Sequence, residues 1–383
     1  MPNIIVLGAG MVGGAIAIDV ATHLPTATVI AVDADGDKLN VLRGKCSRIS
    51  TIKADLLSAQ NVSGIVKQAD LVISAVPGFM GYGVLENVIS AGKNVVDISF
   101  FPEDPFDLAP LASKMGVAVV FDAGVAPGMC NVIAGYYSRR MDIKSYDCLV
   151  GGLPFKREMP LQYKAPFSPD DVFKQEYIRD ARYIENGQLV VKSALSDVEF
   201  IRFPEVGMLE AFNTDGLRSL LTMFPQIKNK RERTLRWPGH TGWIEGLKKL
   251  GFFRTEPLAI NGTVIIPLDV TSRLLSEKCK LEHGEDEFTV MRVTMRGSSM
   301  GAWRQIVYDL FDKYDSKTDT SSMARTTGYT CSAIANLVLN KKIPALGMFP
   351  PEIVGTIPGC FEFIMGYLRE RNVIYRVRES AIQ

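Results

Sequence analysis

A glycine-rich turn close to the N-terminus constrains the fold of this chain more than any other feature. It follows the apolar run Asn3–Leu7, precedes a helical pattern, and reads Gly8-Ala9-Gly10-Met11-Val12-Gly13. Gly8 permits a tight turn, Gly10 lets a diphosphate approach the backbone, and Gly13 lets the helix pack closely on the strand. The unpaired N–H groups and the dipole at the helix N-terminus favour negative charge. The turn therefore predicts a Rossmann-type α/β fold with a bound dinucleotide. The residues expected to bind it here are Gly8, Gly10, Met11, Val12 and Gly13.

An acidic residue at the end of the second expected strand, Val29–Asp33, strengthens this prediction. Asp33 follows Gly13 by 20 residues, and at that spacing a carboxylate accepts both ribose hydroxyls of the adenosine. The same carboxylate would repel a 2′-phosphate. We therefore expect NAD as the cofactor and regard NADP as the less favoured one.

Small and polar residues end the other expected strands, and the carboxyl ends of parallel strands line one crevice. Asp55 is interpreted either as a partner of the adenine edge or as a strand-end cap. Ser74, Val76 and Pro77 either leave room for the nicotinamide ribose or form a plain turn. The residues expected to point toward the nicotinamide are Asp97, Ser99 and Asp122.

The periodicity of the chain changes near residue 125. Before that point, short buried runs alternate with helical patterns, which is typical of a doubly wound parallel sheet. After it, longer strands alternate apolar with polar residues, which favours an inserted α+β catalytic domain on a mixed or antiparallel sheet. These strands include Lys144–Val150, Thr263–Val270 and Phe288–Arg296. The predicted domains are 1–125, 126–330, and a C-terminal segment, 331–383, that packs back on the first domain.

Charge and composition exclude several classes of protein. The 43 basic and 42 acidic residues leave a net charge of +1, which argues against a nucleic-acid binder. The basic stretch Lys228–Arg236 is interpreted as a solvated segment. No apolar run approaches the length of about 18 residues that a membrane span needs. Six cysteines without C-x-x-C spacing and three histidines predict a reduced, cytoplasmic protein without a metal site.

A series of motifs follows through the rest of the chain. They are Phe121–Met129, Gly151–Pro154, Leu161–Lys164, Leu209–Gly216, Thr234–His240, Met323–Thr330 and Phe349–Glu352. In this order they resemble the saccharopine dehydrogenase-like family, and within it the order looks most like the lysine 6-dehydrogenase branch. The resemblance covers essentially the whole chain.

The resemblance implies an NAD(P)-dependent oxidoreductase that acts on a C–N bond of an amino acid. In the lysine 6-dehydrogenase branch, the side-chain amine of L-lysine becomes an aldehyde that cyclises to a piperideine carboxylate. Ala126 stands where saccharopine reductases tend to have an aspartate, which disfavours a saccharopine-type enzyme. Lys164 instead suits a substrate with an additional carboxylate, as in saccharopine- or carboxynorspermidine-type enzymes. Family members are commonly homodimers or higher homo-oligomers, and their antiparallel sheet contributes to the contacts.

Oxidation of an amine requires a neutral nitrogen, so a base must first take a proton from the ammonium group. His240 is the first candidate, because histidine titrates near neutrality; the alternative is a structural residue that caps the following helix. Asp122 is the second candidate, either as the base or as the anchor of the amine. A protein that kept the fold and lost the chemistry, such as a nucleotide-binding sensor, remains a third alternative.

The substrate also carries a carboxylate, and three residues are candidates to bind it. Arg236 offers a bidentate fork, Lys164 a point charge and Tyr163 a hydroxyl. Glu210 is expected to pair either with an ammonium group or with Arg236. Thr214 lies in the same motif as Glu210 and completes the predicted substrate-binding set.

Overall fold

The computed structural model describes residues 1–165, 167–344 and 346–382. Its contacts divide the chain into two compact units. The first unit comprises Met1–Arg140 and Met323–Ile374, and the second comprises Met141–Ser322 and the segment that starts at Tyr375. Among the helices of the described residues, none is long and apolar enough to cross a membrane.

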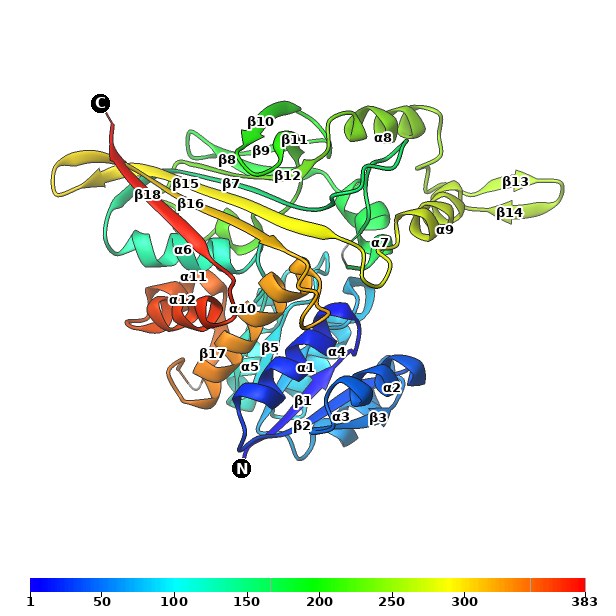
Figure 1. Cartoon of the computed structure of the whole chain (residues 1–383), viewed down its shortest axis with the longest axis vertical. Coiled ribbons are helices and arrows are strands. Elements are labelled where there is room, and N and C mark those ends of the chain that lie inside the picture. Colours follow the sequence, from blue (N-terminus) through cyan, green and yellow to red (C-terminus); the bar gives the residue numbers. More distant parts are fainter. Residues whose placement is uncertain (166, 345, 383) are drawn as a thin grey trace. The chain divides into compact units, whose positions relative to one another are not determined.

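The first unit is built on a parallel sheet with strand order β17-β6-β5-β4-β1-β2-β3 (Figure 1). From β1 the chain runs outward through β2 and β3 and then returns to β4 on the other side of β1. The carboxyl ends of β1 and β4 therefore flank a topological switch point, where open α/β sheets bind nucleotides. The strands are β1 (Asn3–Leu7), β2 (Thr28–Asp33), β3 (Ile49–Lys53), β4 (Leu71–Ser74), β5 (Val95–Asp97), β6 (Ala118–Val120) and β17 (Gly347–Phe349).

Helices accompany this sheet, and its central strands are almost fully buried. In β4 every residue is buried, and in β1 Ile4–Leu7 are at most 2% exposed. A strand shielded on both faces carries a continuous apolar run, as these two do. The helices are α1 (Met11–His23), α2 (Gly36–Lys45), α3 (Ala59–Val66), α4 (Gly78–Ser90), η1 (Pro105–Leu108), α5 (Ala109–Met115), α6 (Met129–Ser138), α10 (Ser322–Leu339), α11 (Pro351–Thr356) and α12 (Cys360–Glu370).

The boundaries of the two units differ from the predicted domain boundaries at 125 and 330. Helix α6 belongs to the first unit because it packs on α11 with glycines at the contact. A Cβ on Gly135 would lie only 1.9 Å from the carbonyl oxygen of Glu352, so the two backbones touch. The C-terminal segment returns to the first sheet through β17, which pairs with β6. Its last strand, β18 (Tyr375–Ala381), pairs instead with β16 of the second unit.

The second unit is built on a nine-stranded mixed sheet. Its main path is β10-β11-β12-β7-β15-β16-β18, with β8 beside β12 and β9 beside β8. The β12–β7 pair is parallel and the others are antiparallel. The strands are β7 (Asp142–Pro154), β8 (Ala181–Glu185), β9 (Gln188–Lys192), β10 (Glu199–Phe203), β11 (Gly207–Asn213), β12 (Asn229–Arg236), β15 (Glu287–Ser299) and β16 (Ala302–Lys313).

Two apolar clusters stabilise the second unit. One gathers Phe173, Phe212 and Ile244 with neighbouring side chains, and the other is formed around Leu235 and Phe288. The short elements are α7 (Pro169–Asp171), η2 (Val172–Glu176), η3 (Arg218–Leu221), α8 (His240–Lys249), α9 (Pro267–Cys279) and the hairpin of β13 (Leu258–Ile260) and β14 (Thr263–Ile265).

Two predictions for the second unit were wrong in part. The strand expected over Thr263–Val270 ends at Ile265, because Pro267 occupies the first position of α9, where its ring favours a helix start. The stretch Lys228–Arg236 is not a solvated segment but contains the interior strand β12. Lys230 is 2% exposed, and its ammonium group donates to the carbonyl oxygens of two residues at and beyond η3, Leu221 and Met223.

Candidate active site

The glycine turn of the first unit has the conformation that its sequence predicts. Gly8 has a φ of +97°, and a Cβ there would lie 2.4 Å from the carbonyl oxygen of Ala75. A Cβ on Gly13 would lie 2.1 Å from the carbonyl oxygen of Gly8, so only glycine permits this close packing. At Gly10 a Cβ would meet nothing within 4 Å, and no side chain caps α1. The N–H groups at the start of α1, from Met11 and Val12 onward, therefore have room for a diphosphate.

Asp33 lies at the end of β2, beside this turn. Its carboxylate accepts hydrogen bonds from the backbone N–H groups of Ala9, at 2.8 Å, and Asp35, at 2.9 Å. The side chain is half-buried, and each carboxylate oxygen has further lone pairs with which to accept a ribose hydroxyl. Two more carboxylates, those of Asp35 and Asp37, follow within four residues, and Asp35 caps α2. The end of β2 is therefore strongly acidic.

Polar groups also end the neighbouring strands β4 and β5. Asp97 is fully buried and accepts from the hydroxyl of Ser99, at 2.9 Å, and from its N–H, at 3.0 Å. Ser74 is equally buried, with its hydroxyl 3.4 Å from that of Ser99. Burial raises the pKa of Asp97 to about 7, and the nearby Asp122 carboxylate adds to the rise against the hydrogen bonds from the two serines. Asp122 itself is 3% exposed and adopts a left-handed backbone with φ +53°.

The remaining residues predicted beside the cofactor occupy turns in the first unit. Val76 is buried, while Pro77 is exposed and immediately precedes α4. Asp55 is exposed, and its carboxylate accepts from the N–H of Leu57 at 2.9 Å. That bond belongs to the turn before α3, whose first N–H groups are capped by Ser58.

Arg236, at the end of β12, organises a buried polar network in the second unit. The guanidinium is 3% exposed. Its Nε donates to the Tyr177 hydroxyl at 3.0 Å, and its Nη2 donates to Tyr163 at 3.3 Å and to the Glu176 carboxylate at 3.1 Å. The Tyr163 ring lies 4.2 Å from the guanidinium carbon, a cation–π distance. Arg236 is thus held in one orientation with its charge balanced by Glu176.

His240, the first residue of α8, joins the same network but does not titrate near neutrality as expected. It is fully buried, its Nδ1 donates to the Leu161 carbonyl at 2.7 Å, and its Nε2 accepts from the Tyr177 hydroxyl at 2.8 Å. Burial lowers its pKa to about 3, and the positive charge of Arg236 adds to this effect. The imidazole is therefore neutral and bonded at both nitrogens, and it orients the hydroxyl of Tyr177.

Glu210 and Lys164 also have roles that differ from the expected ones. Both oxygens of Glu210 bind the start of α8: they accept from the N–H of Gly239, at 2.8 Å, and from the N–H and hydroxyl of Thr241, at 2.5 and 2.6 Å. Glu210 is thus a helix cap, and pairing with Arg236 is not its role. The Lys164 ammonium group donates to the Lys278 carbonyl at 3.1 Å and lies 4.0 Å from Glu158.

Thr214 belongs to a row of polar side chains that extends the network away from Arg236. Its hydroxyl lies 3.0 Å from a carboxyl oxygen of Glu232 and 2.8 Å from the hydroxyl of Thr234. Thr234 in turn donates to Glu176 at 3.1 Å. Glu232, Thr234 and Arg236 alternate along β12, so their side chains lie on one face of the strand.

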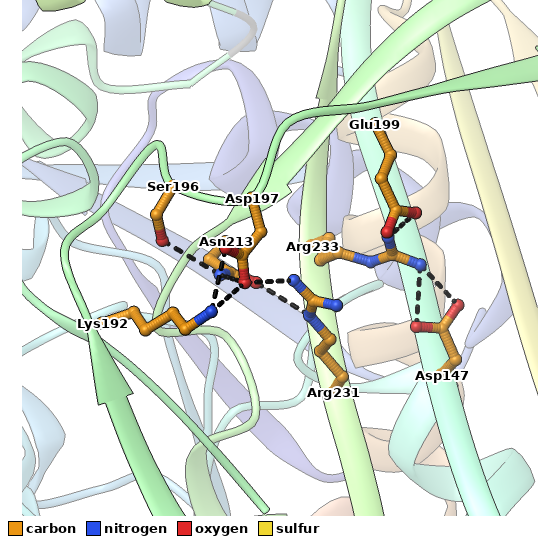
Figure 2. Close-up of polar contacts among 8 residues, drawn as sticks. All are labelled: Asp147, Lys192, Ser196, Asp197, Glu199, Asn213, Arg231 and Arg233. Carbon is orange, nitrogen blue, oxygen red and sulfur yellow. Dashed lines mark hydrogen bonds and ion pairs between the residues drawn. The ribbon is translucent and has the colours of Figure 1, made fainter. Parts of the chain in front are cut away.

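The opposite face of β12 carries ion pairs (Figure 2). Arg233 lies between two carboxylates: it donates to Glu199 at 2.6 Å and to Asp147 at 3.0 Å. Arg231 donates to Asp197 at 3.0 Å, and that carboxylate also accepts from other residues of the cluster. Those further donors are Lys192 and Asn213, and Asn213 also bonds Ser196. We name these eight residues the ionic face.

Four residues of the network were missed by sequence reasoning. Glu176 and Tyr177 lie at the end of the short π-helical turn η2, which has no sequence motif of its own. Glu232 and Thr234 were hidden in the stretch interpreted as solvated. The alternation of Glu232, Thr234 and Arg236 with residues of the other face is a period-two strand pattern, and it would have identified β12 as a strand.

Comparisons with known proteins agree with this architecture. Residues 4–120 match the Saccharopine dehydrogenase NADP binding domain, and residues 124–374 match the Saccharopine dehydrogenase C-terminal domain. The solved structure of apo saccharopine dehydrogenase (L-Glu forming) from Saccharomyces cerevisiae superposes with a TM-score of 0.78 and 19% identity, covering 100% of both chains, so the two share a fold.

Curated relatives are distant. Mitochondrial alpha-aminoadipic semialdehyde synthase from Rattus norvegicus is 25% identical over 272 residues, which are 66% of this chain and 29% of that protein. This chain thus spans less than a third of the length of the first curated relatives that it matches. Carboxynorspermidine synthase from Vibrio alginolyticus is 23% identical over 331 residues, 79% of this chain and 78% of that protein.

The parallel sheet with its glycine turn and switch point defines a nucleotide-binding protein of the Rossmann class. The two matches together cover most of the chain. The chain therefore belongs to the saccharopine dehydrogenase family.

Proposed function

We propose that this protein is an NAD-dependent oxidoreductase that converts the side-chain amine of L-lysine to an aldehyde, which cyclises to a piperideine carboxylate. The family and the nucleotide site support oxidoreduction at an amino-acid C–N bond. The choice of lysine rests on the charge balance around Arg236 and on the order of the motifs, which looks most like the lysine 6-dehydrogenase branch.

The choice of lysine as the substrate rests on how the cations of the second unit are paired with carboxylates. Arg236 is already paired with Glu176, and only Lys164, 4.0 Å from Glu158, is a weakly compensated cation of the predicted substrate-binding set. A substrate with several carboxylates would need several cations that are not already compensated. L-Lysine brings one carboxylate and one ammonium group to the reaction, which suits a nearly neutral set of residues. Arg236 and Tyr163 are the proposed partners of that carboxylate.

The proposed reaction consumes L-lysine, NAD⁺ and water and releases NADH, ammonium, the aldehyde and one proton. NAD, when bound, accepts a hydride from the carbon that carries the amine. The protein must first remove a proton from the side-chain ammonium, so that the nitrogen lone pair can assist the departure of the hydride. We propose that the carboxylates at the ends of β5 and β6 accept this proton from the ammonium group. Asp122 binds the amine, and Asp97, with a pKa of about 7, holds a proton near neutral pH.

The acidic end of β2 supports NAD over NADP, although the matched family domain is named for NADP. Asp33, Asp35 and Asp37 place three carboxylates close to where the adenosine ribose binds. A 2′-phosphate there would meet strong repulsion. Asp33→Ser should therefore lower the preference for NAD by about tenfold or more. The kcat/KM values for NAD and NADP, measured with the same amino acid, check this.

A second candidate function is a reductase that joins an amino compound to an aldehyde, as the name of the Vibrio relative suggests. Lys164 favours it, because its side chain is 15% exposed and its charge is only weakly compensated by Glu158 at 4.0 Å. In that case NADPH or NADH oxidation would require two carbon substrates together.

A substrate screen of the purified protein distinguishes the two candidates. We expect growth of NADH absorbance with L-lysine and NAD alone, and formation of a piperideine product. No turnover of lysine, together with turnover of saccharopine or carboxynorspermidine, would exclude the lysine proposal. Asp122→Asn should lower kcat by about 10²–10⁴-fold if this carboxylate serves the proton transfer.

We also propose that the protein acts as a homodimer or a higher homo-oligomer. The strands β10 and β18 are the ends of the main path of the second sheet, and an open edge strand offers unpaired backbone groups to another chain. Light scattering coupled to size-exclusion chromatography checks the proposal, since a monomer at micromolar concentration would contradict it.

A further inference from the structure

We infer that Glu232 carries a proton in the resting protein and is a positioning residue, which directs a one-way chain of hydrogen bonds through Thr214 and Thr234 to Glu176. Glu176 holds Arg236 at 3.1 Å, so the chain fixes the guanidinium. The inference rests on the proposed function only where Arg236 is taken to bind the carboxylate of the substrate.

The inference rests on counting the hydrogens that the row Glu232–Thr214–Thr234–Glu176 needs for its contacts. The contacts Glu232–Thr214, Thr214–Thr234 and Thr234–Glu176 measure 3.0, 2.8 and 3.1 Å. Each contact between two oxygens needs one hydrogen, and the two threonine hydroxyls supply two. The remaining hydrogen must come from one of the two carboxyl groups. A row with both carboxylates ionised would leave one of the three contacts, two oxygens at most 3.1 Å apart, with no hydrogen between them.

Glu232 is the carboxyl group that holds this hydrogen. Glu176 faces the guanidinium of Arg236 and is stabilised as a carboxylate. Among the described residues no ion pair joins Glu232 to a cation; the charged groups that act on it are the carboxylates of Glu176 and Asp215, and Asp215 is itself paired with Arg179 and Arg182. Burial raises the pKa of Glu232 to about 8 against the hydrogen bonds with Thr214 and the backbone of Gly216, and the two neighbouring carboxylates add to the rise.

The backbone beside Glu232 leaves space for the carboxyl group and for nothing larger. A Cβ on Gly216 would lie 2.2 Å from the Oε2 atom of Glu232. The side chain is 6% exposed, and its hydrogen bond with the backbone of Gly216 holds the carboxyl group beside Thr214. This close contact keeps the row intact.

The hydrogens of the row point in one direction as a result. Glu232 donates to Thr214, Thr214 donates to Thr234, and Thr234 donates to Glu176. When Glu232 loses its proton at alkaline pH, Thr214 turns to donate to it and Thr234 turns to donate to Thr214, so the contact between Thr234 and Glu176 loses its hydrogen. Thr234 and Glu176 then separate, and Arg236 is no longer fixed in place for a carboxylate.

Two variants separate this role from a purely structural one. In Glu232→Gln the side chain keeps its size and an N–H donor for Thr214, but it cannot ionise. In Glu232→Met the size is similar and the donor is lost. We expect the KM of the wild type for its amino-acid substrate to rise about tenfold per pH unit above about pH 8, with kcat much less affected. Glu232→Gln should keep the neutral-pH KM and lose this rise, whereas Glu232→Met should have a raised KM at every pH.

Infrared difference spectroscopy of the full chain provides a readout that needs no turnover. The spectrum of the wild type minus that of Glu232→Gln, in which the band of Asp97 cancels, should contain a carboxylic-acid carbonyl band at neutral pH that disappears above about pH 8. Glu232→Gln should lack the band, and Thr234→Val, which removes one hydroxyl from the row, should shift it. Absence of the band in the wild type, or a KM of Glu232→Gln that matches Glu232→Met, would overturn the inference. A normal band without lysine oxidation would refute the proposed function and leave the proton on Glu232 established.

Discussion

The two faces of β12 differ in how far the carboxylates beside their arginines are exposed to solvent. On the ionic face, arginines meet carboxylates that are partly open to solvent: the Glu199 side chain is 52% exposed and Asp147 is 33% exposed (Figure 2). On the other face, Glu232 and Arg236 are buried. Exposed ion pairs contribute little, because water and salt screen them. A buried charge without its partner is costly.

The comparison indicates which face can serve function. On the ionic face the carboxylates that pair with Arg233 and Arg231 are partly open to solvent, so water can solvate them when a partner is removed. The buried face depends on each hydrogen and on one compensating charge. A substrate carboxylate that reaches Arg236 therefore acts on a group whose orientation is tightly controlled. We expect variants of the two faces to differ accordingly.

The largest expected difference is between Arg236→Met and Arg233→Met. Loss of Arg236 leaves the Glu176 carboxylate, 15% exposed, without its partner, and this should lower the free energy of unfolding by about 3–5 kcal/mol. It should also lower kcat/KM by about 10²-fold or more. Arg233→Met leaves carboxylates that water can solvate, so it should cost about 1 kcal/mol. Urea denaturation measures the loss of stability and steady-state kinetics the loss of kcat/KM. Equal losses in Arg236→Met and Arg233→Met would contradict the proposed difference between the two faces.

Glu232→Gln should change the dependence of stability on pH. The pKa of Glu232 rises on folding from its ordinary 4.5 to about 8. Between these values the folded protein therefore holds a proton that the unfolded chain has lost, and stability falls as pH rises. The glutamine has no such loss. At about pH 8 the variant should be more stable than the wild type by on the order of 2–4 kcal/mol, relative to their difference below pH 4.5. Parallel curves from chemical denaturation would contradict the assigned proton.

Thr234→Val should have a smaller effect. The substitution keeps the shape of the side chain and removes one hydroxyl, so Thr214 and Glu176 each lose a partner. We expect a loss of about 1–3 kcal/mol in the free energy of unfolding, independent of salt. If the loss of unfolding free energy in Thr234→Val disappears in molar salt, the contacts of Thr234 behave like the solvent-screened ion pairs of the ionic face, which would contradict this prediction.

The smallest effect is expected for Asp197→Asn on the ionic face, because asparagine, unlike alanine, suits the left-handed backbone of this residue, with φ +52°. Hydrogen bonding to Lys192 holds the pKa of Asp197 below its usual value against partial burial, with help from Asn213 and the charges of Lys192 and Arg231. Its contribution to stability is present above the unfolded pKa and lost as pH falls through the folded one. The cost should be about 0.5–1 kcal/mol at low salt and vanish in about 1 M salt. Thermal unfolding in a salt series measures it, and a cost unchanged by salt would contradict the assignment.

Local sequence patterns predicted much of the first unit. The strand expected over Asn3–Leu7 has these bounds in the structure, and Gly8 and Gly13 have the close backbone contacts that the motif requires. The reason is that the turn, the strand and the helix are neighbours in sequence and each has its own signal. The six cysteines are also free, as expected.

The second unit was harder because its contacts join distant parts of the chain. Arg233 binds carboxylates 34 and 86 residues away, so the charge balance of β12 is invisible in a local window. The environment of His240 depends on Tyr177, 63 residues away, and on complete burial. A pKa near neutrality was therefore a poor expectation for this residue, because residue type alone does not reveal desolvation.

Isotope transfer from labelled substrate tests the proposed activity most directly. L-Lysine that carries deuterium on its side-chain terminal carbon is incubated with NAD⁺ and the purified protein, and the reduced nucleotide is analysed by NMR. The account predicts one deuterium on the nicotinamide ring of the NADH formed, with a piperideine carboxylate as the carbon product. Reduced nucleotide without deuterium, or no reaction with lysine while a multi-carboxylate amine such as saccharopine reacts, would contradict it.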